Sequence, residues 1–292
     1  MANMFSMKQI YLNGQFLPPQ EAAISVFDRG FVFGDGVYEV IPVFGKRLFR
    51  LPHHLARLQI SLAAIRLSNP LSEREWGDML TRLIAAESAN DQSVYLQVTR
   101  GVAPRDHAFP PDTKPTVFAY AQPLTYPSNE QLAQGVSAIT IPDNRWHRCD
   151  IKSIALLANA LLRQEAIDAN AAEAILVRDG CVTEGAASNI FMVRGGHLVT
   201  PPKGPGILAG ITRDLVLELA RAHGISCAED TIREPELERA EEIWMTSSTK
   251  EIMPITRLNR KPVGEGRPGQ LHGRLLALYR EYKQDFCAGR VE

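Results

Sequence analysis

The sequence predicts an α+β protein divided into two domains, and three observations support this fold class. The chain has 292 residues, which is enough for two domains of ordinary size. Strand-type and helix-type patterns are mixed without a strict β-α-β alternation, which favours a mixed sheet over a doubly wound fold. A polar segment with two prolines, 123–128, is the best candidate for a linker. We therefore expect an N-terminal domain over 1–122, a linker region over 123–135 and a C-terminal domain over 136–292.

The N-terminal part is predicted to combine short strands with two helices. Asn13-Gly14 is a hairpin signal between two apolar runs. Leucines and isoleucine at helical spacing predict a helix over 52–67. Ser72 and Glu75 form a capping-box pattern that predicts the start of a second helix. Strands are expected at 10–12, 15–17, 37–44, 94–99 and 116–120.

The C-terminal part carries a second set of mixed elements. Helices are expected over about 154–168 and about 211–223. Gly224 stands where a glycine commonly ends a helix, so it predicts the end of the second of them. Strands are expected at 136–141, 174–177, 190–193 and 242–246.

Composition and charge exclude several classes of protein. The formal net charge is −1 and no basic block occurs, so neither a nucleic acid nor an anionic membrane is an expected partner. The four cysteines are scattered without a C-x-x-C pair, which argues against a disulfide framework or a metal site. The N-terminus lacks the apolar core of a signal peptide, and no apolar run is long enough to span a membrane. We expect a cytoplasmic protein that acts on small molecules.

Lys152 is the first candidate for covalent chemistry. The chain has 24 arginines but only eight lysines, and Lys152 is the one lysine between residues 115 and 202. It stands directly before the apolar run 154–158. An amine that is partly withdrawn from water becomes a nucleophile, and arginine cannot replace it in Schiff-base chemistry. The alternative is an ordinary surface lysine.

Two features could bind an anion such as a phosphate. The glycine-rich segment 204–212 leads into the helix expected at 211, where free N–H groups suit a phosphate. It matches no standard P-loop, since no Gly-Lys-Ser/Thr follows, and the alternative is a plain glycine turn. Arg57, midway along the helix over 52–67, could supply a second contact. The alternative is that Arg57 is an ordinary charged side chain on the solvent-exposed face of that helix.

Four further side chains could bind parts of a cofactor or substrate. Glu184 follows a strand and could keep a heterocyclic nitrogen protonated, which turns a pyridine ring into an electron sink. Arg105 and His107, two positions apart in a proline-rich loop, could grip a carboxylate, and Tyr38 could donate its hydroxyl to the same group. The alternative for Glu184 is an ordinary acidic residue in a turn, and for Arg105 and His107 an ordinary surface loop. The alternative for Tyr38 is an aromatic side chain that fills the core.

The order of these features along the chain resembles fold-type IV pyridoxal-phosphate (PLP) aminotransferases. This group includes branched-chain aminotransferases, D-amino-acid transaminases and aminodeoxychorismate lyase, and the D-amino-acid transaminases are the most similar. The resemblance extends from about residue 8 to about residue 285. It rests on Asp28-Arg29-Gly30, Phe33 to Val40, Arg57-Leu58, Gln97 to Gly101, Arg105-x-His107, Arg148 to Ser153, Thr183-Glu184-Gly185, Ser188-Asn189, Gly210 to Arg213 and Thr246 to Thr249.

The resemblance implies a fold, a cofactor and roles. The fold is a small N-terminal α/β domain and a larger C-terminal domain with pyridoxal 5'-phosphate between them. Lys152 is then the Schiff-base lysine and proton shuttle, and Glu184 the partner of the pyridine nitrogen. The phosphate cup would comprise Arg57, the backbone N–H groups of Ile211 and Thr212, and Ser248; the carboxylate trap would comprise Tyr38, Arg105 and His107. In relatives the Arg-x-His loop reaches the neighbouring subunit, so a homodimer is implied.

The implied reaction converts D-alanine and 2-oxoglutarate into pyruvate and D-glutamate. The Arg105-x-His107 pair favours it over an L-branched-chain aminotransferase, as does Glu39-Val40 where branched-chain relatives usually carry Glu-Gly. Ile41-Pro42 departs from some D-specific relatives, which have a lysine there, so fine substrate preference stays open. A lyase of the aminodeoxychorismate type and a non-catalytic carrier on the same scaffold are the remaining alternatives.

Overall fold

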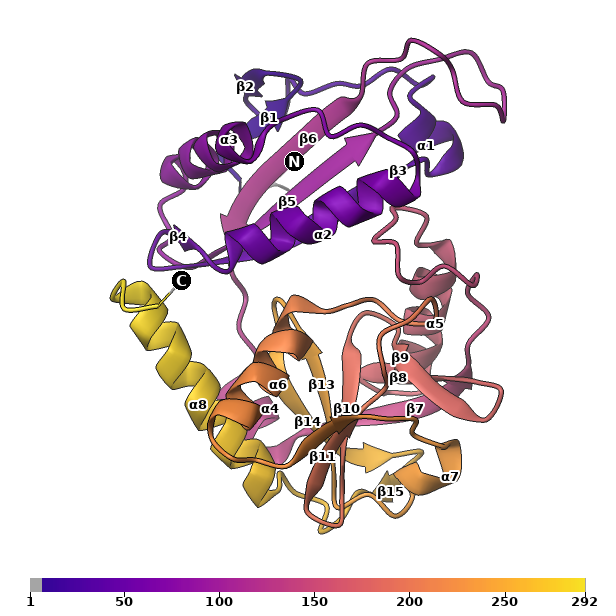
Figure 1. The fold of residues 1–292 in the computed structure, drawn as a ribbon, viewed down its shortest axis with the longest axis vertical. Helices are drawn as coiled ribbons and strands as arrows, with labels where there is room; N and C mark the ends of the chain where they lie inside the picture. Colours follow the sequence, from indigo (N-terminus) through magenta and orange to yellow (C-terminus); the bar gives the residue numbers. More distant parts are fainter. Residues whose placement is uncertain (1–6, 292) are drawn as a thin grey trace. The chain divides into compact units, whose positions relative to one another are not determined.

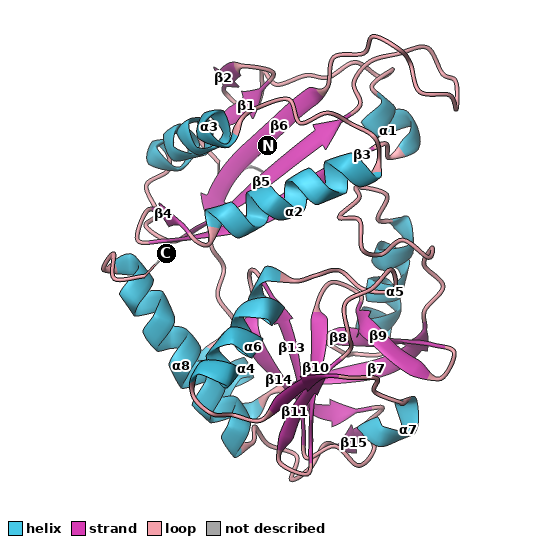
Figure 2. Ribbon diagram, viewed as in Figure 1, coloured by secondary structure: helices cyan, strands magenta, loops and turns pink. Residues whose placement is uncertain are grey.

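The computed structural model describes residues 7–291 and divides them into two compact units, each with its own sheet and helices (Figures 1 and 2). The first unit comprises residues 7–125, 151–155 and 286–291, and the second comprises residues 126–150 and 156–285. The predicted α+β fold class is confirmed. No helix in the described range is long and apolar enough to cross a membrane.

The sheet of the first unit is antiparallel at every pairing between described strands. Its order is β2-β1-β6-β5-β3-β4. Asn13 and Gly14 both have positive φ, 48° and 91°, as a two-residue hairpin turn requires, so the predicted hairpin is confirmed. The strands are β1 (Ile10–Leu12), β2 (Gln15–Leu17), β3 (Gly36–Phe44), β4 (Arg47–Leu48), β5 (Gln92–Thr99) and β6 (Thr116–Pro123).

Helices α2 (Leu51–Ala64) and α3 (Glu73–Ala86) cover one face of this sheet (Figure 1). The core combines apolar side chains of both helices with those of the three longest strands. The capping box of Ser72 and Glu75 is present at the start of α3, as predicted. The short helix α1 (Arg29–Phe33) begins at Asp28, whose side chain accepts a hydrogen bond from the Gly30 N–H group.

The second unit contains a nine-stranded mixed sheet among the described residues. Its order is β12-β11-β10-β13-β14-β7-β8-β9, and β15 pairs with β14. Strand β7 runs parallel to β8 and β14, whereas β13 runs antiparallel to both of its neighbours. The strands are β7 (Val136–Pro142), β8 (Glu173–Arg178), β9 (Cys181–Gly185), β10 (Asn189–Arg194), β11 (His197–Thr200), β12 (Cys227–Glu229), β13 (Glu242–Ser247), β14 (Glu251–Leu258) and β15 (Lys261–Pro262).

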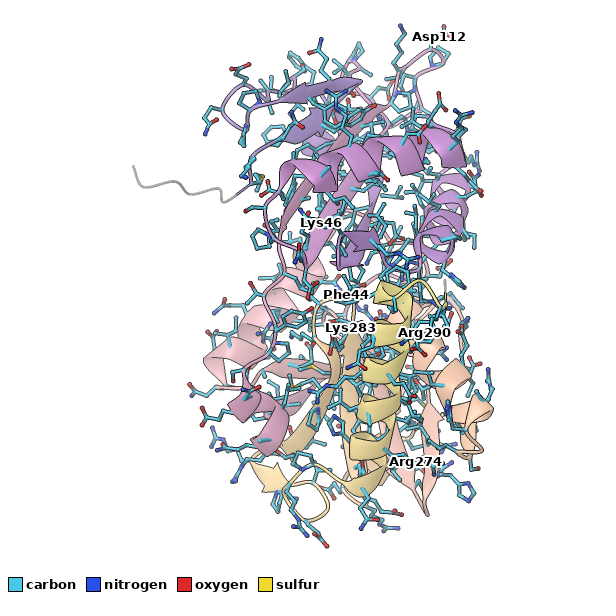
Figure 3. All side chains as sticks on the ribbon, turned by 90° about the vertical axis from the view of Figure 1, so that its left-hand side faces the viewer. Phe44, Lys46, Asp112, Arg274, Lys283 and Arg290 are labelled. Atoms are coloured by element: carbon cyan, nitrogen blue, oxygen red, sulfur yellow. The ribbon has the colours of Figure 1, made fainter. Side chains whose placement is uncertain are left out.

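The helices of the second unit pack around this sheet. They are α4 (Asn129–Gln134), α5 (Leu157–Asp168), α6 (Ile211–Ala222), α7 (Glu234–Leu237) and α8 (Gln270–Cys287), the last of which ends beyond the unit. Gly224 has φ 64° just after α6, as expected of a glycine that ends a helix. Helix α8, which sequence patterns left unassigned, carries Arg274 and Lys283 (Figure 3). Lys283 bonds to Glu251 on β14 at 2.6 Å, and Arg274 donates to the His223 carbonyl at 2.9 Å.

The segment around Lys152 differs from the prediction. The helix expected from 154 begins only at Leu157, because the segment 151–155 pairs with β3 through a bridge between Ser153 and Val37. The Ile154 N–H group donates to the Gly36 carbonyl at 3.1 Å, which holds the backbone out of a helix. The expected linker over 123–135 stays a prediction; within it, α4 is capped by Ser128.

Candidate active site

Lys152 is held in the first unit by backbone hydrogen bonds. Its carbonyl accepts from the Tyr38 N–H group at 3.0 Å, and its own N–H group donates to Ser61 Oγ at 3.2 Å. Its Nζ lies 4.2 Å from the centroid of the Tyr38 ring. An ammonium group over an aromatic face is an attractive contact. The structure therefore brings together Lys152 and Tyr38, two residues that the sequence singled out separately.

Arg57 lies one helical turn before Ser61, and its guanidinium forks onto a buried carboxylate. Its Nε donates to Glu39 Oε1 at 2.8 Å and its Nη2 to Glu39 Oε2 at 2.7 Å. His54 Nδ1 lies 2.8 Å from the same Oε2. Glu39 and His54 are fully buried and Arg57 nearly so. Sequence analysis missed Glu39 and His54, although Glu39 adjoins Tyr38 in β3.

The charges in this cluster follow from burial and pairing. Burial alone would raise the pKa of Glu39, but the Arg57 charge and the hydrogen bonds from Arg57 and His54 lower that pKa to about 2. Burial lowers the pKa of His54 despite the neighbouring carboxylate. At neutral pH the cluster therefore holds an ionised Glu39, a charged Arg57 and a neutral His54.

Arg105 and His107 lie in the exposed loop between β5 and β6. The Arg105 guanidinium carbon is 5.3 Å from the centroid of the Phe33 ring, and the His107 ring centroid is 5.4 Å from it. The two predicted carboxylate-binding residues thus meet at one aromatic ring. Tyr38 stacks on Tyr95 instead, at 5.7 Å, and in the described part of this chain it contacts neither member of the pair.

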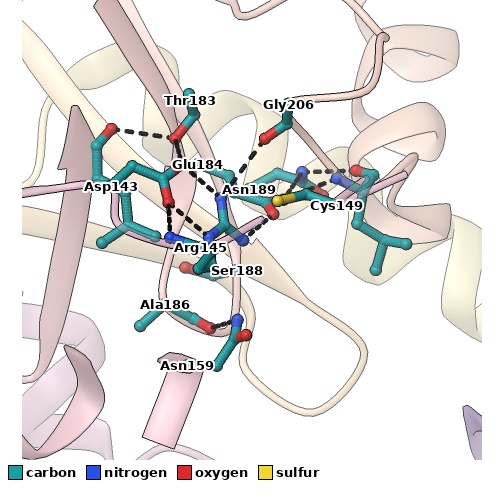
Figure 4. Close-up of polar contacts among 12 residues, drawn as sticks. Asp143, Arg145, Cys149, Asn159, Thr183, Glu184, Ala186, Ser188, Asn189 and Gly206 are labelled. Carbon is teal, nitrogen blue, oxygen red and sulfur yellow. Dashed lines mark hydrogen bonds and ion pairs between the residues drawn. The ribbon is translucent and has the colours of Figure 1, made fainter. Parts of the chain in front are cut away.

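Glu184 lies buried on β9 in the second unit, surrounded by donors (Figure 4). Its Oε1 accepts from Arg145 Nη1 at 2.5 Å, and its Oε2 accepts from the Leu208 N–H group at 2.9 Å and from Asn189 Nδ2 at 3.2 Å. Burial alone would lower the pKa of Arg145, but Asp143 and Glu184 raise it, so the guanidinium stays charged. No sequence signal distinguished Arg145 from the other arginines.

Asn189 joins the start of α6 to the sheet. Its side chain donates to the Leu208 carbonyl at 2.9 Å, and it pairs with Thr246 across β10 and β13. A Cβ on Gly210 would stand 1.9 Å from Asn189 Oδ1, so glycine is required there. Ser248 follows in the half-buried turn after β13. Asn189 thus brings the end of β13 and the first turn of α6 together.

The first turn of α6 presents backbone N–H groups as donors. Gly210 is the N-cap residue, and no side chain caps the helix within the described range. Ile211 and Thr212 are buried, and the N–H groups at a helix start have no partners inside the helix. The Thr246 hydroxyl is also buried, without a hydrogen-bond partner among the described residues. Uncapped N–H groups and a free hydroxyl suit a phosphate oxygen.

The predicted site residues are divided between the two units. Lys152, Tyr38, Arg57, Arg105 and His107 belong to the first unit. Glu184, Ile211, Thr212 and Ser248 belong to the second. The first group offers an amine and cations, and the second offers a buried carboxylate and uncapped N–H groups. No cluster of residues suited to a metal ion occurs among the described residues.

The family model for amino-transferase class IV matches residues 36–258, so the chain belongs to the class IV aminotransferases. Among curated proteins, it is 43% identical to a D-alanine aminotransferase of Bacillus licheniformis, with 90% of this chain and 93% of that protein covered. It is 38% identical to a D-alanine aminotransferase of Staphylococcus aureus (strain COL), with 94% and 98% covered.

Solved structures are similar over nearly the whole chain. The branched-chain amino acid aminotransferase of Escherichia coli matches with a TM-score of 0.90 at 26% identity, covering 98% of this chain and 96% of that one. The branched-chain aminotransferase of the thermophilic archaeon Thermoproteus uzoniensis, solved with norvaline, matches with a TM-score of 0.85 at 26% identity, covering 98% and 96%. The predicted family and fold are therefore confirmed, and the chain is an aminotransferase.

Proposed function

We propose that this protein transfers the amino group of D-amino acids, D-alanine among them, to 2-oxoglutarate with the help of pyridoxal 5'-phosphate. The observation that carries the proposal is the half-buried Lys152, whose backbone is fixed by bonds to Tyr38 and Ser61 and whose Nζ lies over the Tyr38 ring. The D-alanine aminotransferases among the similar proteins support the choice of substrate.

The residues present fit this cofactor. Lys152 would bind its aldehyde carbon through Nζ, and Arg57, the N–H groups of Ile211 and Thr212, and the Ser248 hydroxyl would bind its phosphate. The uncapped start of α6 and the unpartnered Thr246 hydroxyl support such a phosphate site. When bound, the cofactor supplies a ring that accepts negative charge from the substrate α-carbon.

Glu184 would hold one proton and Lys152 would transfer another. Glu184 would hold a proton on the ring nitrogen, and Arg145 keeps that carboxylate in place through the 2.5 Å bond to Oε1. Lys152 Nζ would remove the α-proton and return it to the carbon derived from the cofactor's aldehyde, acting as base and then as acid. Replacing Lys152 by alanine is expected to abolish turnover while the fold persists; turnover by Lys152→Ala would contradict this role.

Arg105, His107 and Tyr38 would bind the substrate carboxylate and thereby decide which enantiomer points its hydrogen at Lys152. We further propose a cytoplasmic homodimer in which each Arg105 loop serves the neighbouring subunit; the loop is exposed in the single chain, as such a role requires. Arg105→Ala should raise KM for D-alanine by about 10-fold, because a charge-assisted hydrogen bond contributes roughly 1.5–3 kcal/mol. An unchanged KM would remove Arg105 from the substrate site.

An L-branched-chain aminotransferase is the second candidate, because the similar solved structures carry that name. The absorbance spectrum of the purified protein separates the two. Loss of the yellow cofactor band with D-alanine and not with L-leucine would support the D-specific reaction. Loss with L-leucine alone would establish the branched-chain reaction and contradict the role of the Arg105 and His107 pair. A protein that stays colourless after purification with pyridoxal phosphate would refute both.

A further inference from the structure

We propose that Phe33 and a largely buried Arg29–Asp35–Arg100 cluster are positioning residues that fix the loop carrying Arg105 and His107. The inference rests on the proposed function, in which these two side chains bind the substrate carboxylate. A grip by two side chains requires both to be held in one arrangement, whereas exposed loops are mobile by default.

Arg105 and His107 both contact the ring of Phe33. This ring lies 5.3 Å from the Arg105 guanidinium carbon and 5.4 Å from the His107 ring centroid, and the Arg29 guanidinium carbon is 4.7 Å away. Cations over an aromatic face are attracted to it, more strongly as water is excluded. One ring therefore sets the direction of both side chains.

The helix that carries Phe33 is itself anchored to both ends of the loop. Asp28, which caps α1, accepts from the Thr99 hydroxyl at 2.8 Å and from the Thr116 hydroxyl at 2.6 Å. Thr99 ends β5 before the loop, and Thr116 begins β6 after it. The Arg29 N–H group also donates to the Gly101 carbonyl at 2.8 Å. The strand ends and α1 thus form one frame.

Arg29 binds the middle of the loop directly. Its Nη1 donates to the Asp106 carbonyl at 2.5 Å and to the Ala108 carbonyl at 3.4 Å. Asp106 is the residue between Arg105 and His107, so this bond fixes the backbone from which both side chains project.

Asp35 holds Arg29 and Arg100 in place. Its Oδ2 accepts from Arg29 Nε and from Arg100 Nε, each at 2.8 Å, and its Oδ1 accepts from Arg100 Nη2 at 3.0 Å. The Arg100 guanidinium carbon lies 3.7 Å from the centroid of the Phe109 ring, two positions beyond His107 in the same loop. Both arginines are buried, at 4% and 5% exposure, so we expect loss of the carboxylate to weaken the contacts that they make with the loop.

The experiment compares the holoenzyme with the variants Phe33→Leu and Asp35→Asn. Trypsin cleavage after Arg105, mapped by mass spectrometry, reports opening of the loop without any reference to activity. We expect cleavage to become several-fold faster in both variants. We also expect KM for D-alanine to rise about 10-fold with kcat changed far less, because a displaced binding group weakens substrate binding.

Two further variants serve as controls. Asp78→Asn removes a carboxylate from an exposed pair with Arg74 and should change neither cleavage nor KM. Phe33→Tyr keeps the ring and should restore slow cleavage and a low KM. If Asp35→Asn does not fold, Phe33→Leu tests the inference alone.

The outcomes separate this inference from the proposed function. Unchanged cleavage and KM in Phe33→Leu, while Arg105→Ala raises KM, would overturn the positioning role and leave the substrate role of Arg105 standing. Faster cleavage in Phe33→Leu, with KM unchanged both in Phe33→Leu and in Arg105→Ala, would show that the loop does not bind substrate, and both ideas would fail. Faster cleavage and a higher KM together support the inference.

Discussion

The two units each bury an arginine against a carboxylate, but the two clusters are built in opposite ways. In the first unit, the single carboxylate of Glu39 receives both Nε and Nη2 of Arg57. In the second unit, Arg145 is shared between Asp143 and Glu184, and Glu184 also accepts from a backbone N–H group. In the proposed function the first cluster presents a cation and the second presents an anion. In the first unit the carboxylate of Glu39 therefore positions the guanidinium of Arg57. In the second unit the guanidinium of Arg145 positions the carboxylate of Glu184.

The largest expected effect is on stability, from Glu39→Ala. The variant leaves the buried Arg57 without the carboxylate that receives its fork, and breaking a buried ion pair costs about 3–5 kcal/mol. Urea unfolding of the two proteins measures the difference. Glu238→Ala, which removes an exposed partner of Lys261, is the matched control and should change stability little. Equal losses in the free energy of unfolding of the two variants would mean that the buried Glu39–Arg57 pair matters no more to stability than an exposed pair.

Glu184→Gln tests the cluster of the second unit, and it should lower kcat. The amide keeps the shape of the side chain but cannot hold a proton on a ring nitrogen, so we expect kcat to fall by about 100-fold or more, the scale of losing one preorganised electrostatic group. The protein should keep its yellow band, because the phosphate contacts remain. Near-normal kcat with full cofactor loading would exclude Glu184 from the proton-holding role.

Arg57→Lys should act on cofactor affinity instead. Lysine keeps the charge but cannot fork onto Glu39, so its ammonium would be less well aimed at a phosphate. We expect the Kd for pyridoxal phosphate to rise about 10-fold, because one charge-assisted hydrogen bond contributes roughly 1.5–3 kcal/mol. Pyridoxal without the phosphate serves as the control ligand, and its Kd should not change. An equal change for both ligands would show that Arg57 does not contact the phosphate.

The last prediction concerns pH. The pKa of Glu39 is lowered from its ordinary value to about 2, so its ionised form is favoured in the folded protein. The stability that this pairing contributes is fully present above the unfolded pKa near 4.5 and is lost as the pH falls towards 2. Between pH 7 and 5 this group should contribute almost no slope. Unfolding measured from pH 5 to 2.5 should show a shallower decline in Glu39→Gln than in the parent protein, and equal slopes would contradict the assignment.

Local signals in the sequence were sufficient for much of the fold. The hairpin at Asn13-Gly14, the capping box at Ser72 and the glycine after α6 each depend on residues within a few positions of one another. Such interactions form in the same way wherever the segment lies, so they can be predicted without the rest of the protein. The ordered motifs also identified the family. The roles of Lys152 and Glu184 follow from that resemblance and await the experiments above.

The tertiary structure decided which partners the candidate residues have. Arg57 meets Glu39 across 18 positions and Arg145 meets Glu184 across 39, and both pairings depend on how strands and helices pack. The segment around Lys152 has an apolar, helix-like sequence, yet hydrogen bonds to β3 keep it out of a helix. The sequence by itself thus determined many of the elements and the family. Only packing decided which charges are buried together, because burial and distance between remote residues, and not their spacing in the chain, set the energy of a charge pair.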